Sequence, residues 1–252
     1  MAYLIDTHAH LDMYENWAEI FQNAQENNVK KIVIPSVETQ YFQKVVDIAN
    51  SSDDLFCMMG IFPTEAKTWT DDILDEMEKF AEDKKVVAIG EVGLDYYWDK
   101  TFVDKQQDIF IKQIKLANKL GLPLVIHDRD AHKDCFDILK EYNKGSKVLF
   151  HCFSGSPEFA QECVKEGWLI ALGGVVTFKN AVKPKEVAQA VPLSHLVLET
   201  DSPYLTPVPY RGKENRPAYV KYVAEEIAKL RGVETDEIIE KTTRNAEEFF
   251  GI

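Results

Sequence analysis

The sequence predicts an α/β fold of the (β/α)8 TIM-barrel type with extra C-terminal helices, and three observations support this prediction. Eight short apolar runs rich in β-branched residues alternate with segments of helical period. The runs are almost continuously apolar, as expected of parallel strands that are buried on both faces. The length of 252 residues is close to the usual length of such a barrel, about 250 residues. We therefore expect a single domain over residues 1–252.

The eight apolar runs are expected to form the strands, in this order: Leu4–Thr7, Lys31–Val37, Leu55–Ile61, Val86–Glu91, Pro123–His127, Lys147–His151, Leu169–Gly173 and Leu196–Thr200. An open, doubly wound sheet is the alternative arrangement of such runs. No Gly-x-Gly-x-x-Gly sequence follows the first run, so the dinucleotide-binding form of that fold is not indicated. The closed barrel is therefore the preferred prediction.

Helix-end signals support the same alternation. Thr101 is expected to be the N-cap of a helix that stops at Gly121. Ser156 followed by Pro157 predicts a second helix start, because serine caps helices and proline suits the first helical position. Two further helices are expected to close the chain: Pro217–Leu230 and Thr235–Phe250.

The acidic composition limits the partners that the surface can bind. Lys plus Arg number 29 and Asp plus Glu number 42, so the formal charge is −13 at pH 7. A broad basic face for nucleic-acid backbones is not expected, although a buried metal site can still bind a phosphate locally. No apolar run approaches the roughly 18 residues of a membrane span, and Asp6 and His8 interrupt the first run. We expect a soluble cytoplasmic protein without a membrane partner, and the oligomeric state is left open, a monomer included.

Two histidines stand two residues apart where the first predicted strand ends. On a helix, His8 and His10 would point about 200° apart. On a strand, both side chains lie on one face and can bind the same metal ion. The alternative is two histidines that each have a separate hydrogen-bond partner.

Further residues of metal-binding type stand where other predicted strands end: Glu91, His127, His151 and Asp201. Each alone has a structural alternative, such as an ion pair for Glu91, a core position for either histidine, or a turn or helix N-cap for Asp201. The carboxyl ends of barrel strands form one face, so all these side chains would meet there. Their joint burial without an ion would be unfavourable, and a metal site is therefore predicted.

The predicted donor set indicates which ions fit. Four imidazoles and two carboxylates, without a thiolate, suit Zn²⁺ or Mn²⁺, and a carboxylate-rich site can also bind Mg²⁺. Six ligands exceed the number that one catalytic zinc ion takes from a protein, usually about three. Two divalent ions about 3.5–4 Å apart, with a bridging carboxylate, fit the number better.

Five stretches resemble the motifs of TatD-type metal-dependent hydrolases: Asp6–Asp12, Ile89–Tyr96, Ile126–Ala131, His151–Gly155 and Leu198–Leu205. The similarity extends to Arg211–Lys213 and Thr243–Ala246, so it covers nearly the whole chain. This family is a branch of the amidohydrolase-like barrels, and members described as deoxyribonucleases dominate it. The resemblance implies a metal-dependent hydrolase that cleaves phosphodiester bonds by attack of a metal-activated water, with single-stranded DNA as its partner and 3′–5′ exonuclease action as one form.

The resemblance also implies roles for six residues around two ions: His8, His10 and Asp201 at the first, His127 and His151 at the second, and Glu91 at both. Asp201 would orient or deprotonate the attacking water, and Glu91 would bridge the ions. Asp6 and Glu199 are candidates for partners of these ligands, or for strand-end acids that only stabilise the barrel.

Three residues on the predicted active face are candidates for substrate binding: Arg129, Tyr96 and Arg211. Arg129 could contact a phosphate, or it could pair with Asp128 or Asp130. Tyr96 and its aromatic neighbours could stack on unpaired bases, or they could only pack within their loop. One departure from the family pattern is Phe62, where many relatives carry histidine, and this leaves the substrate open.

Three functions therefore compete. The preferred one is a deoxyribonuclease. The second is hydrolysis of a small-molecule ester, lactone or amide at the same metal site, in line with the acidic charge and Phe62. The third is a non-catalytic metal-binding barrel, which the retained ligand set disfavours.

Overall fold

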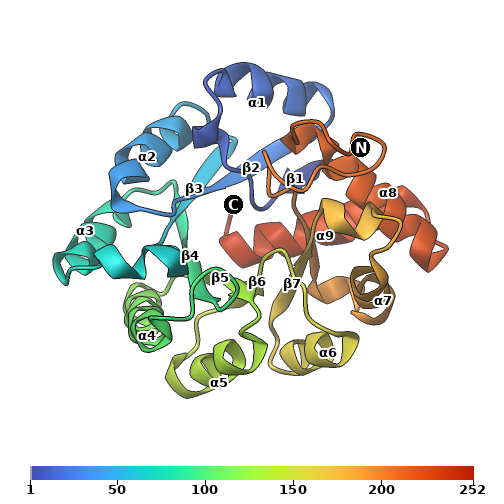
Figure 1. Cartoon of the computed structure of the whole chain (residues 1–252). Coiled ribbons are helices and arrows are strands. Elements are labelled where there is room, and N and C mark those ends of the chain that lie inside the picture. Colours follow the sequence, from blue (N-terminus) through green and yellow to red (C-terminus); the bar gives the residue numbers. More distant parts are fainter. Residues whose placement is uncertain (1) are drawn as a thin grey trace. The chain divides into compact units, whose positions relative to one another are not determined.

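The structure, a computed structural model, describes residues 2–252 (Figure 1). The strands are β1 (Leu4–Asp6), β2 (Val29–Pro35), β3 (Leu55–Met59), β4 (Val86–Asp95), β5 (Leu124–Arg129), β6 (Val148–Phe150), β7 (Leu169–Leu172) and β8 (Leu196–Leu198). The helices are α1 (Trp17–Glu26), α2 (Phe42–Asn50), α3 (Asp72–Phe80), α4 (Val103–Leu120), α5 (His132–Tyr142), α6 (Pro157–Lys165), α7 (Val182–Ala190), α8 (Val220–Arg231) and α9 (Thr235–Phe250).

The eight strands form one sheet in the order β1-β2-β3-β4-β5-β6-β7-β8. Each strand is followed by a helix, and α9 is added after α8. This sequential parallel order is that of a (β/α)8 barrel, so the predicted fold class with extra C-terminal helices is confirmed. Within residues 2–252, no helix is long and apolar enough to cross a lipid bilayer.

The chain divides into two compact units. Unit one consists of Met1–Ile34 and His151–Ile252, and unit two consists of Pro35–Phe150. Unit one contains the parallel pairs β1–β2 and β7–β8, and unit two contains β3, β4, β5 and β6 paired in that order. The single domain expected over residues 1–252 stays a prediction.

In unit two, β4 is the central element, because all ten of its residues are buried. It pairs with β5 beyond the predicted end of the strand, up to Asp95, in register with Arg129. Gly93 makes this pairing possible, since it has φ of +142° and a Cβ there would lie 2.0 Å from the carbonyl oxygen of His127. A glycine at this position therefore lets β4 and β5 run close together to the edge where Asp95 and His127 lie.

In unit one, side chains of α9 form hydrogen bonds to the backbone at the start of β1 and at the start of β8. The hydroxyl of Thr243 donates to the carbonyl oxygen of Tyr3 at 2.5 Å, and the Asn245 amide donates to Leu193 and Leu196 at 2.7 Å each. The Thr243–Ala246 segment, which resembles the family motif, therefore has a structural role, because two of its side chains form hydrogen bonds to the backbone next to the strands.

Most predicted helix ends are confirmed, with two corrections. The helix predicted at Pro217–Leu230 is instead a 3-10 turn at Pro217–Tyr219 followed by α8, which runs from Val220 to Arg231. Gly121 caps α4 in the left-handed conformation, and α6 begins at Pro157 after Ser156. The predicted N-cap at Thr101 is wrong, because α4 begins at Val103 and Phe102 is its N-cap. The Thr101 amide and hydroxyl instead donate to Asp99 at 2.8 and 2.7 Å, in a turn before the helix.

The cap of α6 gives a measurable stability prediction. The Ser156 hydroxyl accepts a hydrogen bond from the Phe159 amide at 3.2 Å. We expect Ser156→Ala to lower the free energy of unfolding by about 1 kcal/mol, because this amide loses its partner within the helix end. Urea denaturation measures the change, and Ser156→Asp, which can still accept the bond, is the matched control. Equal stabilities of Ser156→Ala and the native chain would contradict the cap.

Candidate metal centre

His8 and His10 follow β1 in unit one, where their backbone lies next to the segment after β8. The His8 carbonyl accepts from the Asp201 amide at 2.9 Å, and the His10 amide donates to the Ser202 carbonyl at 2.8 Å. The Ala9 amide donates to Val33 on β2 at 3.2 Å. This extended backbone places His8 and His10 on the same side, both buried, as the two-residue spacing predicts.

The first possible metal-binding group consists of His8, His10 and Asp201. One potential ligand atom from each lies within 4.8 Å of the others. The Asp201 Oδ1 atom lies 3.6 Å from His10 Nε2 and 4.0 Å from His8 Nε2. Burial raises the pKa of the Asp201 carboxyl, but the His10 hydrogen bond and the charges of nearby imidazoles lower this pKa below its usual value. A carboxylate that stays ionised beside imidazoles suits a divalent ion.

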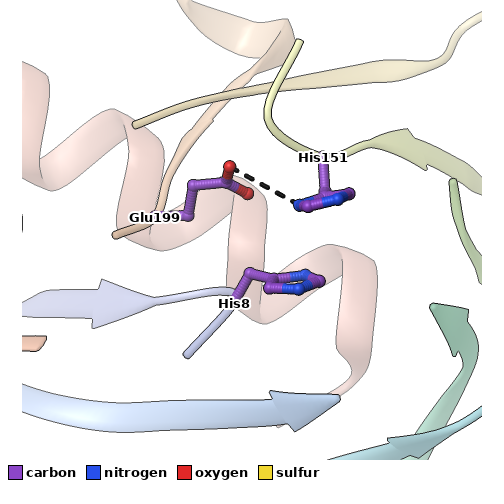
Figure 2. A group of neighbouring side chains, drawn as sticks. All are labelled: His8, His151 and Glu199. Atoms are coloured by element: carbon purple, nitrogen blue, oxygen red, sulfur yellow. Dashed lines mark ion pairs between the residues drawn. The ribbon is translucent and has the colours of Figure 1, made fainter. Parts of the chain in front are cut away.

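A second group in unit one consists of His8, His151 and Glu199 (Figure 2). The His8 and His151 rings are stacked with centroids 3.9 Å apart, and Glu199 Oε1 lies 3.7 Å from His151 Nδ1. The Cys152 amide donates to the same Oε1 atom at 2.7 Å. The other oxygen, Oε2, is buried and has no hydrogen-bond partner within residues 2–252. A buried carboxylate oxygen beside two imidazoles is a suitable ligand for a divalent ion, so the chemistry of these three residues fits the predicted metal.

Glu199 enters this group although the sequence indicated only a supporting role for it. Its position two residues before Asp201 was the available signal, since both follow β8. We expect Glu199→Gln to weaken zinc binding by about ten- to a hundredfold, because residues that hold a metal-binding histidine affect affinity to this extent. Competition with a zinc indicator measures it, and Glu186→Gln at an exposed position of α7 is the control. Unchanged affinity would remove Glu199 from the site.

Unit two holds Glu91 and His127, the other two predicted carboxylate and imidazole ligands. His127 Nδ1 lies 2.9 Å from Glu91 Oε1, and His127 Nε2 lies 3.0 Å from Asp95 Oδ2. The Glu91–His127 distance is that of a direct contact between an imidazole and a carboxylate, and both groups are of the kind that bind divalent ions.

Asp95 is the residue that the sequence did not assign. It is fully buried, and its Oδ1 atom also accepts from the amides of Tyr97 and Trp98 at 2.9 and 3.1 Å. Burial raises the Asp95 pKa, but the bonds from His127 and these amides lower it below the usual value. An ionised Asp95 holds the His127 Nε2–H and leaves Nδ1 directed at Glu91, as carboxylate–histidine pairs do at metal sites.

The predicted ligands are thus grouped within each unit. Unit one brings together His8, His10, His151 and Asp201, and unit two brings together Glu91 and His127. That these six residues bind two ions, with Glu91 as the bridge, stays a prediction.

The predicted substrate residues have other contacts. The Arg129 guanidinium lies over the Tyr97 ring, with Cζ 3.9 Å from the centroid, and Arg211 Cζ lies 3.8 Å from the Phe178 centroid. The Tyr96 hydroxyl donates to Asp134 at 2.8 Å. Their roles in substrate binding stay predictions. For Arg129, the alternative of an ion pair with an adjacent aspartate does not appear in the described chain.

The Phe62 side chain lies directly against a predicted ligand. Its ring centroid is 4.5 Å from that of His127, with the planes at 61°. An apolar ring therefore covers part of the imidazole, at a place where the sequence departs from many relatives.

Comparison with known proteins identifies the family of this chain. The family described as TatD related DNase matches residues 5–251. The metal-dependent hydrolase YabD of Bacillus subtilis is 43% identical over 255 residues, which cover 99% of each chain. YcfH of Escherichia coli K12, also described as a metal-dependent hydrolase, is 35% identical over 261 residues, covering 99% of this chain and 96% of YcfH.

Solved structures give the same result. The crystal structure of the TatD homologue YjjV of Escherichia coli K12 has a TM-score of 0.93 and 31% identity, covering 99% of this chain and 98% of YjjV. A TatD family hydrolase of Entamoeba histolytica has a TM-score of 0.86 and 26% identity, covering 99% of each chain. The chain described here therefore belongs to the TatD family of metal-dependent hydrolases.

Proposed function

We propose that this chain is a divalent-metal-dependent deoxyribonuclease that cleaves phosphodiester bonds of single-stranded DNA. The observation that carries the proposal is the group of His8, His10 and Asp201, whose ligand atoms lie within reach of one ion. The family description, TatD related DNase, supports a phosphodiester as the bond that is cleaved.

The predicted ligands are the residues that would hold the ions: His8, His10, Glu91, His127, His151 and Asp201, with Zn²⁺, Mn²⁺ or Mg²⁺ as candidates. Divalent ions, when bound, lower the pKa of water and stabilise negative charge on phosphate oxygens. Asp201 is the proposed base, which takes a proton from the attacking water and passes it to the leaving oxygen. Asp95 holds the ring of His127 in the orientation that directs Nδ1 at Glu91.

Hydrolysis of a small-molecule ester, lactone or amide is the second candidate. The contact between Phe62 and His127 favours it, because an apolar ring beside a predicted ligand suits an uncharged substrate. The net charge of −13 also repels a long polyanion.

One experiment separates the two candidates. The protein is freed of metal with a chelator, reloaded with Mg²⁺, Mn²⁺ or Zn²⁺, and given end-labelled single-stranded DNA beside a panel of lactones, esters and amides. Metal content is measured for each preparation. We expect metal-dependent cleavage of DNA and little turnover of the panel. Turnover of a lactone, ester or amide without DNA cleavage would contradict the nuclease proposal and support the second candidate.

Phe62 gives a prediction about rate. We expect Phe62→His to raise kcat/KM for DNA by about tenfold or more, because an imidazole there supplies a proton donor or a phosphate contact. Steady-state kinetics measure the change, and Phe62→Leu, which keeps an apolar side chain, is the matched control. A rate that does not rise in Phe62→His would show that the absent imidazole does not limit this chain.

A further inference from the structure

Tyr97, Trp98 and Arg129 form an exposed cluster in unit two, which we call the aromatic–arginine cluster. Tyr97 and Trp98 are 54% and 66% exposed, and their ring centroids are 5.0 Å apart with planes at 84°. Arg129 Cζ lies 3.9 Å from the Tyr97 centroid and 5.3 Å from the Trp98 centroid. Adjacent apolar side chains that are open to solvent are a feature of ligand-binding and partner-binding surfaces.

Arg129 forms no ion pair with any of the residues that the structure describes. No carboxylate in residues 2–252 pairs with it, although the chain has 42 acidic residues against 29 basic ones. The neighbouring Asp128 is instead bound to His132, with 2.7 Å between Oδ2 and Nδ1. The guanidinium therefore stacks on the Tyr97 ring, and its N–H groups can donate hydrogen bonds to an anion. Arginine binds phosphate through such N–H donors.

Backbone contacts fix this cluster to the predicted metal ligands of the same unit. Asp95, which binds His127, also accepts the amides of Tyr97 and Trp98. Arg129 lies on β5 two residues after His127, so both side chains project from the same face, with Cα atoms about 6.6 Å apart. Arg129 also pairs in register with Asp95. One carboxylate thus positions both the His127 ring and the two aromatic residues.

We propose that the aromatic–arginine cluster is a nucleotide subsite of the proposed nuclease, on which this inference rests. Trp98 and Tyr97 stack on an unpaired base, and Arg129 binds the phosphate attached to that nucleotide. Stacking needs no broad basic surface, which agrees with an acidic protein that still takes single-stranded DNA. The two contacts, one aromatic and one cationic, recognise one nucleotide beside Glu91 and His127.

The test compares two substrates with the metal-loaded protein. One is a short single-stranded DNA, and the other is an abasic strand with the same phosphates. We expect Trp98→Ala to raise KM for the intact strand by about 5- to 100-fold, the range measured for loss of a stacked base. On the abasic strand the increase should be at least fivefold smaller. Arg129→Ala should raise KM on both strands to a similar degree, because both keep the phosphate.

Binding without turnover gives a second measurement. A fluorescent phosphorothioate strand that resists cleavage should bind Trp98→Ala more weakly than the native chain, and Trp98→Phe should restore most of the affinity. Arg244→Ala is the charge-matched control, since Arg244 is exposed on α9 and pairs with Glu248. This control should bind and cleave DNA like the native chain.

The outcomes separate the two proposals. If the native chain cleaves no nucleic acid, the nuclease proposal and this subsite are both overturned. If the native chain cleaves DNA but Trp98→Ala and Arg129→Ala change KM by less than about twofold, only the subsite is overturned. A Trp98→Ala effect of equal size on intact and abasic strands would overturn the stacking contact.

Discussion

Replacing Asp201 by asparagine is expected to lower the rate of DNA hydrolysis by about a thousandfold or more, within the range for loss of a general base. The carboxylate lies 3.6 Å from His10 Nε2 and 4.0 Å from His8 Nε2, so it is close to both of the imidazoles that follow β1. Asparagine has nearly the same shape but cannot take a proton from water. It also removes a negative charge that a divalent ion would bind.

Three measurements separate this loss of chemistry from a loss of fold. Circular dichroism should show an unchanged spectrum, metal analysis should report how much ion is retained, and kcat should fall at saturating substrate. Asp236→Asn, at an exposed position of α9, is the control and should keep native activity. If Asp201→Asn cleaved DNA at the native rate with its metal bound, Asp201 would not be the base.

The fold was predictable because the strands have a strong local signal. Each of the eight apolar runs became a strand, since continuous β-branched segments suit a sheet that is covered on both faces. The ends were less predictable. β4 extends to Asp95 because Gly93 allows a close approach to β5, and α4 starts after Thr101 because Asp99 binds that residue in a turn. Such contacts depend on neighbours in space and not on local pattern.

The candidate site also has features that the sequence predicted and features that it could not predict. The spacing of His8 and His10 showed that one face would carry both. The pairing of Asp95 with His127 could not be predicted, because it needs the register of two strands 32 positions apart at these residues. Arg129 is a similar case, since its aspartate neighbours were the candidate partners but its guanidinium lies over the Tyr97 and Trp98 rings.

Removal of the Asp6 side chain is expected to lower the stability of the fold more than Ser156→Ala does. Asp6 is fully buried at the end of β1, and its carboxyl accepts from the Thr200 amide at 2.9 Å, the Thr200 hydroxyl at 2.5 Å and the His8 amide at 3.3 Å. Burial raises its pKa to about 8, which the bonds from Thr200 and His8 only partly offset. These bonds join β1 to the segment after β8 that leads into Asp201.

We expect Asp6→Ala to lower the free energy of unfolding by about 3–5 kcal/mol, because three buried donors lose their acceptor together. Asp6→Asn is the matched variant: its oxygen can still accept both amides, and its amide group can meet the Thr200 hydroxyl with the donor role reversed. It should therefore lose less than half as much stability. Urea denaturation of both variants measures the difference. Equal losses would mean that the charge or the acid proton of Asp6, and not its acceptor geometry, holds the His8 and Asp201 segments together.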